Sequence, residues 1–316
     1  MNVRDGQELA LRLLGDGAAA DVSLAPYTTY KLGGPAAVFA SPRNEHELAL
    51  IARAVQETGL PTLVVGRGSN LLVADAGFPG IAITMAAMGE WIQFHDTEVR
   101  AGAAVALPVL ARRSVAEGLV GFEWAVGVPG SVGGAVRMNA GGHGSDMAAT
   151  LLGVHAFDLH SGHRGWVPVG RLGMHFRGSL LADHQVVLDA RMQLARGDSA
   201  AAEVLLAEIV RWRREHQPGG QNAGSVFVNP IPGELSAAVL VDELGLRGFQ
   251  VGGAFVSDKH SNFIQATQAA AAADVRAVME HVRAAVTQRT GIVLRSELKL
   301  VGFADVPATM DVGVEL

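Results

Sequence analysis

Two glycine-rich segments contain the residues best suited to hold a phosphate group through main-chain contacts. The first is GRGSN, residues 66–70, between two short apolar runs at 63–65 and 71–73. Successive backbone N–H groups in such a loop can form a concave anion site, to which the Ser69 hydroxyl and the Asn70 amide can add contacts. A tight hairpin also favours Gly and Asn, so this loop taken alone is interpreted as a turn.

The second segment is GVPGSVGGA, residues 127–135, followed by NAGGHG at 139–144. Such small residues leave few side chains for packing, so either the main chain meets a ligand or the segment simply turns. Two such segments in one half of the chain can both donate to one diphosphate, and this combination favours nucleotide binding. Residues 66–70 lack the third glycine and the following helix that a dinucleotide-binding loop requires.

Three polar side chains further along the chain have types that suit acid–base or charge-stabilising chemistry. Ser225 lies in a turn-rich stretch without the Gly-x-Ser-x-Gly surroundings of a nucleophile, so on its own it is interpreted as a turn serine. Arg177 has no special local context. Alternation places Glu297 on one strand face with Arg295 and Lys299, and that face is expected to be exposed to solvent.

The histidines do not indicate a metal site. His260 lies among polar neighbours and fits a surface position as well as a ligand contact. His155, His160 and His163 fall in a turn-rich region without the spacing of a known metal site, and the sequence contains no His-Glu-x-x-His. We therefore expect no metal.

The composition indicates a globular chain of about two domains. It has 316 residues, of which 49% are hydrophobic and 18% charged, and its mean hydropathy is +0.26. Lys and Arg number 25 against 31 Asp and Glu, a formal net charge of −6, and no basic cluster suits a nucleic-acid backbone. The absence of cysteine excludes disulfides, thiolate metal sites, thiol nucleophiles and a cysteinyl bond to a cofactor.

The sequence does not predict export or membrane insertion. Four charged residues interrupt the apolar positions of the first 14 residues, unlike a signal peptide. The longest weakly charged stretches, 76–89 and 124–136, are shorter than a bilayer span and contain Gly or Pro. A cytoplasmic protein is expected.

The elements that must position these groups follow from the apolar spacing. Helical periodicity with suitable caps predicts helices at residues 44–59, 107–117, 201–214, 235–244 and 270–290. Short apolar runs predict strands at 63–65, 71–73, within 155–194 and within 251–263, and alternation predicts one at 292–301. The pattern indicates a β-rich first part with the glycine loops and a compact α+β unit after about residue 198.

The ordered set of motifs resembles one family. These motifs are TTYKLGGPA at 28–36, GRGSN at 66–70, VPGSVGGA at 128–135 with NAG at 139–141, FRGS at 176–179, NAGSVFVNP at 222–230, SDKHSNF at 257–263, and Glu297. Each motif is modest evidence, but their order from about residue 24 to residue 302 resembles the bacterial UDP-N-acetylenolpyruvoylglucosamine reductases, the MurB family.

The resemblance implies an α+β fold with non-covalently bound FAD. An N-terminal helix or lead-in at 1–23 precedes a two-lobed FAD-binding domain of the vanillyl-alcohol-oxidase (PCMH) type at 24–197, with lobes 24–85 and 86–197. A substrate-binding domain at 198–302 and a tail at 303–316 follow. The residues expected to contact FAD are Val65, Gly66, Arg67, Gly68, Ser69, Asn70 and Leu71 in the first loop, and Val128, Pro129, Gly130, Ser131, Gly133, Gly134, Ala135 and Asn139 around the second.

The resemblance also implies a reaction in which NADPH reduces FAD and UDP-N-acetylglucosamine enolpyruvate is then reduced to UDP-N-acetylmuramate. Hydride addition beside a carboxylate leaves an enolate, so the site needs a cation or acid at the carboxylate and a proton donor at the α-carbon. Ser225 matches the family's proton donor, and Arg177 and Glu297 match its charge-stabilising pair. Glu297 would work best when protonated.

Asn229, Arg214 and His260 are the residues expected to contact the substrate. The sequence departs from the family at Phe176, where tyrosine is usual, and at Gly142-His143, which replaces the common Ala-Tyr. These departures concern positioning rather than the reaction. The only partner implied is the small-molecule UDP-sugar, with no nucleic acid, membrane or obligate protein partner.

Three other functions remain as alternatives. A flavin oxidase of the same superfamily would turn over with oxygen instead of NADPH. A non-catalytic nucleotide-sugar-binding protein would bind UDP-sugars without being reduced, but the retention of Arg177, Ser225 and Glu297 argues against it. A Rossmann dehydrogenase would need a three-glycine loop before a helix, which is absent.

Overall fold

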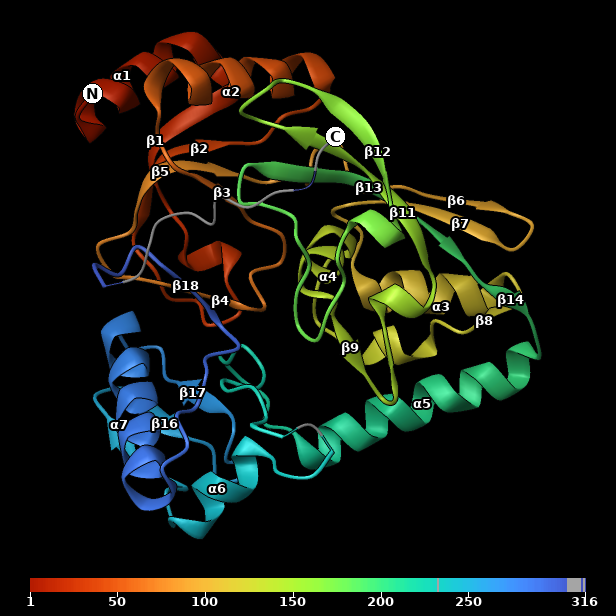
Figure 1. Cartoon of the computed structure of the whole chain (residues 1–316), viewed down its shortest axis with the longest axis vertical. Helices are drawn as coiled ribbons and strands as arrows, with labels where there is room; N and C mark the ends of the chain where they lie inside the picture. The colour runs from red at the N-terminus through yellow and green to blue at the C-terminus, as the bar shows by residue number, and fades with distance from the viewer. Residues whose placement is uncertain (232, 306–313, 315) are drawn as a thin grey trace.

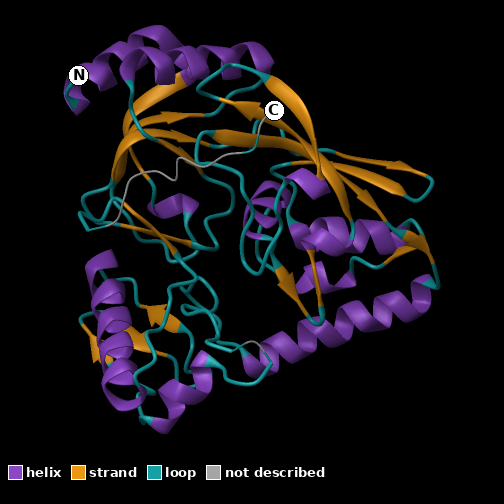
Figure 2. Cartoon of the chain, in the orientation of Figure 1, coloured by secondary structure: helices purple, strands orange, loops and turns teal. Residues whose placement is uncertain are grey.

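The computed structural model describes residues 1–231, 233–305, 314 and 316. Two β-sheets and their helices form a large upper part, a smaller α+β unit lies below it, and the long helix α5 runs beneath the upper part toward that unit (Figure 1, Figure 2). No helix in the described residues is long and apolar enough to cross a membrane.

The first sheet is four-stranded, in the order β1-β2-β5-β3, and β1 is antiparallel to β2 whereas β2 and β3 are parallel to β5. Helices α1 and α2 pack together beside it (Figure 1). Asn44 caps α2 by accepting from the Glu47 N–H, and Gly59 ends it in the left-handed region, which confirms the predicted helix. The bounds are α1 Val3–Leu14, β1 Ala18–Ser23, β2 Pro35–Ala40, α2 Glu45–Thr58, β3 Thr62–Val64 and β5 Phe78–Ile83.

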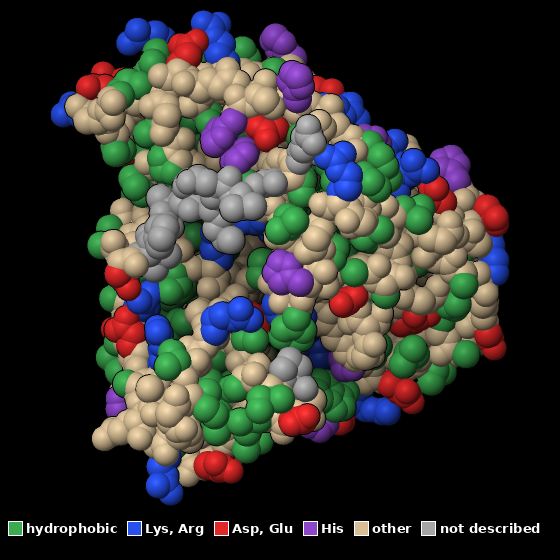
Figure 3. Space-filling view, viewed as in Figure 1, with side chains coloured by type: hydrophobic (Ala, Val, Ile, Leu, Met, Phe, Trp, Pro, Cys, Tyr) green, Lys and Arg blue, Asp and Glu red, His purple; other side chains and the backbone are tan. Residues whose placement is uncertain are grey.

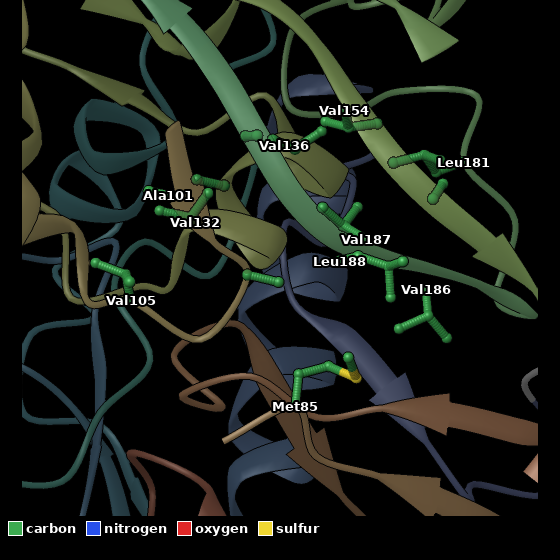
Figure 4. Packing of buried hydrophobic residues seen from close by; sticks show 14 of the residues in the cluster. Met85, Ala101, Val105, Val132, Val136, Val154, Leu181, Val186, Val187 and Leu188 are labelled. Atoms are coloured by element: carbon green, nitrogen blue, oxygen red, sulfur yellow. The ribbon is translucent and has the colours of Figure 1, made fainter. Parts of the chain in front are cut away.

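The second sheet is five-stranded and fully antiparallel, in the order β12-β11-β13-β7-β6. Helix α4 packs on its inner face, where Val132 and Val136 meet side chains of β7, β11 and β13 (Figure 4). Helices α3 and α5 lie beyond α4 (Figure 1). The bounds are β6 Ile92–His95, β7 Glu98–Gly102, α3 Leu107–Ala116, α4 Val132–Met138, β11 Leu151–Asp158, β12 Arg164–Pro168, β13 Gln185–Gln193 and α5 Ser199–His216.

Short strand pairs and turns complete this part of the chain. The pairs are β8 Leu119–Val120 with β14 Ala195–Arg196, and β9 Gly141–Gly142 with β10 Ser145–Asp146. The 3-10 turns are η1 Gly15–Gly17, η2 Ala25–Tyr27, η3 Glu123–Gly127, η4 Met147–Ala149 and η5 Val169–Arg171.

The lower unit has its own core but borrows residues from the start of the chain. Tyr30, Leu32 and Leu72 pack among the side chains of α6, α7 and the three-stranded sheet β15-β16-β17. The buried Tyr30 hydroxyl donates to the carbonyl of Ile264 at 3.0 Å, and burial raises the Tyr30 pKa. The bounds are α6 Ala237–Glu243, β15 Gln250–Val251, β16 Ala254–Val256, β17 Ile264–Ala266 and α7 Ala272–Thr290.

The boundary between the hydrophobic core of the upper part and that of the lower unit does not fall at residue 198, where the sequence predicted it. The buried face of α5, formed by Ala202, Leu206 and Ile209, belongs to the core of the upper part, so the change of core falls after α5 instead of at residue 198. The expected N-terminal helix is present as α1, but residues 1–23 are part of the upper part and not a separate lead-in, because α1 packs on α2 and β1 is a strand of the first sheet. Most of the predicted tail lies outside the described residues, but Val314 is buried and hydrogen-bonds to Gln185.

The structure corrects the prediction for residues 292–301. Only β18, Lys299–Val301, is a strand, and it pairs in parallel with β4, Leu71–Val73. The face expected to be exposed is instead mostly covered: the side chains of Glu297 and Lys299 are 17% and 32% exposed, and only Arg295 is open to solvent. The loop at residues 173–184 lies against them and supplies an opposite charge to each, Arg177 to Glu297 and Asp183 to Lys299.

The outer face of the second sheet contains a buried carboxylate, Asp189, between Arg100 and His155. Arg100 donates two hydrogen bonds of 2.8 Å to it, and His155 Nδ1 lies 3.0 Å from Oδ1. Burial by itself would raise the pKa of Asp189, but these hydrogen bonds outweigh it and hold that pKa below its usual value. The stabilisation is therefore present above the unfolded-state pKa and is lost as the pH falls through the folded-state pKa.

We predict that Asp189→Asn lowers the free energy of unfolding by about 1–3 kcal/mol at pH 7, because hydrogen bonds to a charged acceptor are lost. It should also remove part of the loss of stability that the wild type shows below about pH 4. Urea unfolding followed between pH 7 and pH 3 measures both effects. The control is Asp96→Asn, at an exposed pair 3.2 Å from Arg196, with an expected change below about 0.5 kcal/mol; equal effects of the two variants would contradict the prediction.

Candidate functional site

The two glycine loops face each other across a gap too narrow for a side chain. A Cβ atom placed on Gly66 would lie 2.5 Å from the Ser131 hydroxyl, and one on Gly130 would lie 3.7 Å from the Ser69 hydroxyl. Side chains essentially never approach as closely as the first of these distances. Glycine at position 66 therefore allows the loops, which are about 60 residues apart in the sequence, to form one surface.

The first loop offers a row of free main-chain donors. In the described structure none of the N–H groups of residues 66–70 donates to a protein acceptor, whereas Val65 N–H donates to Ile83 O at 2.8 Å. Gly68 lies directly against the backbone of Tyr27. It has φ +60°, and a Cβ atom on it would lie 2.0 Å from Tyr27 O, so this position requires glycine. Strand β4 follows the loop instead of a helix, which rules out the Rossmann arrangement.

The second loop is more fully used by the protein. The N–H groups of Val128, Val132, Gly133 and Ala135 donate to backbone carbonyls. The Ser131 hydroxyl does not cap α4. The donors left for a ligand are this hydroxyl and the N–H groups of Gly130, Ser131 and Gly134. Backbone donors from both loops thus remain available on the surface they share.

An ion pair joins the upper part of the molecule to the lower unit. Arg177 Nε lies 2.8 Å from Glu297 Oε1, and the two side chains are 28% and 17% exposed. The Nε–H does not point along this line, so the contact is an ion pair and not a well-aligned hydrogen bond. Burial raises the pKa of Glu297 above its usual value, and the adjacent guanidinium opposes that shift only in part. This direction agrees with the expected protonated role of Glu297.

Arg177 occupies a strained turn. His175 and Gly178 exchange two backbone hydrogen bonds of 3.0 and 3.1 Å, and Arg177, between them, has φ +59°. Its NH1 group donates to Gly141 O at 3.0 Å, and its guanidinium lies 5.2 Å from the ring of Phe176. The turn thus fixes the guanidinium from three sides.

Ser225 lies in a segment that is hydrogen-bonded through the backbone to Glu297. It is half-buried and forms an isolated antiparallel bridge with Phe263. The next residue, Val226, accepts a 2.8 Å hydrogen bond from the Glu297 N–H. Asn70, at the end of the first glycine loop, donates from Nδ2 to Glu297 O at 3.0 Å. A proton-bearing hydroxyl, a carboxyl group and a guanidinium are therefore held next to the loop that offers free donors.

Comparison with known proteins identifies this arrangement. Residues 216–301 match the family model of the UDP-N-acetylenolpyruvoylglucosamine reductase C-terminal domain, and residues 35–164 match that of an FAD binding domain. The reductase of Heliobacterium modesticaldum is 43% identical over 277 residues, 87% of this chain and 88% of that protein. The reductase of Bacillus subtilis is 36% identical over 94% of this chain and 97% of its own length.

This chain belongs to the UDP-N-acetylenolpyruvoylglucosamine reductase family. A crystal structure of the enzyme from Thermus caldophilus superimposes with a TM-score of 0.76 at 34% identity, covering 90% of this chain and 98% of that one. The resemblance and the fold predicted from the sequence are confirmed: a two-lobed FAD-binding domain precedes the family's C-terminal domain.

The residues of the two glycine loops fit FAD as the cofactor of this reductase. The free N–H groups of residues 66–70 and the narrow approach of Gly66 to Ser131 make a cradle suited to a pyrophosphate. Asn139 differs from the other predicted FAD contacts, because its side chain is fully engaged inside the protein. It donates to Asp146 and to His175 O, each at 3.1 Å, and accepts from Ala148 N–H at 3.0 Å. Its amide therefore supports the turn of Arg177.

The predicted substrate residues are spread around this centre. Asn229 Oδ1 accepts from the Ala237 N–H at 3.1 Å and so anchors the start of α6. His260 is half-buried, and burial together with Arg247 lowers its pKa. Arg214 is exposed near the end of α5, with its carbonyl accepting from Lys259 Nζ at 2.5 Å. Their contacts with substrate stay predictions.

Sequence reasoning missed Arg213. This side chain is half-buried, no acid contributes to its pKa, and burial lowers that pKa. A Cβ on Gly127, at the start of the second glycine loop, would lie 3.1 Å from Arg213 Cδ and 3.3 Å from His143 Nε2. The helical spacing of α5 could have indicated this position. Arg213 follows the buried Ile209 by four residues and so lies on the same face of the helix, whereas Arg214 does not.

The molecule is hollowed between its two domains, and Lys and Arg side chains lie around the hollow on the face shown in Figure 3. A cavity of about 430 Å³ lies beside Arg177 and is lined by Asn139, the β9–β10 hairpin and Phe176. Neither Ser225 nor Glu297 lines it. We therefore place the chemistry where the ion pair and the glycine loops meet, with this cavity adjoining it at Arg177.

We predict that Gly66→Ala weakens FAD binding by about two- to tenfold, because the new methyl group forces the Ser131 hydroxyl to rotate away and removes one donor, at a cost of about 0.5–1.5 kcal/mol. Titration of the apoprotein with FAD, followed by quenching of flavin fluorescence, measures the affinity. Gly142→Ala is the matched control, since a Cβ there meets nothing within 4 Å. Unchanged affinity in the Gly66 variant would show that the two loops do not form the FAD cradle.

Proposed function

We propose that this chain reduces UDP-N-acetylenolpyruvoylglucosamine to UDP-N-acetylmuramate, a step of peptidoglycan precursor synthesis, with NADPH as the reductant. The observation that carries the proposal is the Arg177–Glu297 ion pair, formed across the two domains beside the FAD cradle and next to the Ser225 strand. Membership of the reductase family supports the substrate and the reaction.

FAD, when bound, supplies the hydride that reduces the carbon–carbon double bond. The free N–H groups of residues 66–70, with the Ser131 hydroxyl and the N–H groups of Gly130, Ser131 and Gly134, would hold its pyrophosphate. Val65, Leu71 and Val128 border this surface through their positions in the chain. The remaining chemistry falls to side chains of the protein.

Arg177 and Glu297 act at the substrate carboxylate. When the vinyl carbon gains hydride, negative charge develops on the enolate formed from the α-carbon and the carboxylate. The guanidinium offers a planar pair of donors to that charge, and the raised pKa of Glu297 favours the protonated form of its carboxyl group, which can donate a hydrogen bond. Both groups are held before substrate arrives, so little reorganisation is needed.

Ser225 completes the reaction by giving its hydroxyl proton to the α-carbon, after which the alkoxide regains a proton from solvent. A serine hydroxyl is a weak acid in water, but an enolate carbon is basic enough to take its proton when the two are held in line. The half-buried position of Ser225 limits competition from water.

Arg213 is our candidate for contact with the substrate diphosphate, since it is a half-buried cation whose side chain lies beside Gly127 of the second glycine loop. Asn229 and His260, which follow Ser225 in the sequence, would contact the sugar nucleotide. The exposed Arg214 would contact the substrate from the edge of the site. Because NADPH and UDP-sugars are made inside the cell, we propose that the enzyme works in the cytoplasm.

We predict that Ser225→Ala leaves FAD reduction by NADPH within about twofold and slows reoxidation of the reduced flavin by the enolpyruvyl substrate by about 10²–10⁴, the usual contribution of a positioned proton donor. Anaerobic stopped-flow absorbance separates the two half-reactions. Ser236→Ala is the control, because Ser236 is a helix cap in the same domain and should affect stability alone, by about 1 kcal/mol. Equal slowing of both half-reactions would make Ser225 structural.

We predict that Arg177→Lys slows the reoxidation half-reaction about a hundredfold, because an ammonium group cannot contact Glu297 and Gly141 and also present a planar fork to a carboxylate. The same stopped-flow experiment measures it. Arg191→Lys disrupts another arginine–glutamate pair, the two hydrogen bonds from Arg191 to Glu98 on the outer sheet face, and should leave both rates within twofold. Wild-type reoxidation in the Arg177 variant would remove Arg177 from the mechanism.

A further inference from the structure

The side chain of Asn262 pairs with the main chain that carries Ser225. Its Nδ2 donates to Phe227 O at 2.9 Å and its Oδ1 accepts from Phe227 N–H at 3.0 Å. Its own carbonyl accepts from Val226 N–H at 2.8 Å. The side chain is buried, with 3% of the residue exposed. A single amide thus makes the two hydrogen bonds that a neighbouring strand residue would make.

These hydrogen bonds matter because the Ser225 segment has little regular structure of its own. Gly224 precedes it with φ +76° and Pro230 follows it, and among the described residues its main-chain pairing is limited to isolated bridges, Ser225 with Phe263 and Phe227 with Ser296. On the side opposite Asn262, the segment is held by the Glu297 N–H bond to Val226 O. The segment is therefore hydrogen-bonded on both sides: Asn262 holds Phe227, two residues after Ser225, and Glu297 holds Val226.

We propose that Asn262 is a positioning residue that sets the Ser225 hydroxyl relative to Glu297. The inference rests on the proposed function, in which Ser225 delivers a proton at the α-carbon. Asn262 acts through the backbone of Phe227 and touches neither substrate nor cofactor. A displacement of about 1 Å at a reacting group lowers a rate by about a hundredfold. Loss of the Asn262 hydrogen bonds would therefore slow the step in which Ser225 donates its proton.

The chemistry of the amide explains why asparagine suits this position. The site needs one donor and one acceptor about 2 Å apart on a neutral group, facing a backbone C=O and N–H. A carboxylate of the same shape accepts from the Phe227 N–H but repels the Phe227 carbonyl. A protonated carboxylic acid restores the missing donor, and burial raises the pKa of a carboxyl group placed there.

The test is Asn262→Asp in the FAD-loaded protein, with both half-reactions followed by anaerobic stopped-flow from pH 8.5 to pH 6. We expect FAD reduction by NADPH within about twofold of wild type at every pH. Reoxidation by UDP-N-acetylenolpyruvoylglucosamine should be about a hundredfold slower at pH 8.5 and return to within about fivefold at pH 6. His260, whose Nδ1 accepts from the Asn262 N–H at 3.3 Å, and Glu297 titrate in both proteins, so the ratio of variant to wild type isolates the new carboxyl group.

Asn262→Ser provides a second variant, because its shorter side chain loses both hydrogen bonds at every pH. Its reoxidation defect should be of similar size and independent of pH when divided by the wild-type rate. Asn44→Asp controls for an added carboxylate, since Asn44 is an exposed helix cap that Asp replaces without loss. Melting temperatures of all variants are measured alongside.

The outcomes separate the two proposals. Failure of the wild type to be reoxidised by substrate would overturn the proposed function and this inference with it. Normal wild-type reoxidation with equal loss of both half-reactions in the Asn262 variants, or with lowered melting temperature and unchanged reoxidation, would overturn the positioning role alone. If Asn262→Asp does not fold, a pH-independent and reoxidation-specific defect in Asn262→Ser still supports the role, and its absence refutes it.

Discussion

The site depends on one short stretch of main chain, residues 295–299, that is hydrogen-bonded to both domains. Toward the C-terminal domain, the Glu297 N–H donates to Val226 O. Toward the FAD-binding domain, the Asn70 amide donates to Glu297 O, and the Lys299 N–H donates to Asn70 O. The main chain of Glu297 is thus tied to the Ser225 segment by a backbone hydrogen bond and to the cofactor loop by the Asn70 side chain, independently of any contact that its carboxyl group makes.

Charged side chains then complete the junction. Arg177 and Asp183 lie in one loop of the FAD-binding domain and pair with Glu297 and Lys299, which alternate along the opposing chain. Arg137 adds a second cation to Asp183 at 2.8 Å. Partly buried ion pairs add little net stability, because desolvation offsets most of their attraction. These pairs fix geometry, since each one forms only when the 173–184 loop and residues 295–299 lie in the correct register.

Local signals in the sequence predicted much of this protein. Apolar spacing with an Asn44 cap and a Gly59 terminator sufficed for α2, since those signals act within one helix. Alternation correctly grouped Glu297 with Lys299 but assigned them to solvent, because a period of two does not reveal which face another segment covers. The role of Arg213 required knowing that α5 packs on the FAD-binding domain, a contact formed between distant parts of the chain.

The sharing of Tyr30, Leu32 and Leu72 with the C-terminal core has a consequence for how the chain is made. These side chains leave the ribosome early, yet the α6, α7 and β15–β17 residues that bury them are synthesised about 150 residues or more later. At about 5–20 residues per second this interval lasts about ten seconds or longer. During that time the first domain exposes an apolar surface, so the nascent chain passes through a stage at which chaperones can bind or aggregation can begin.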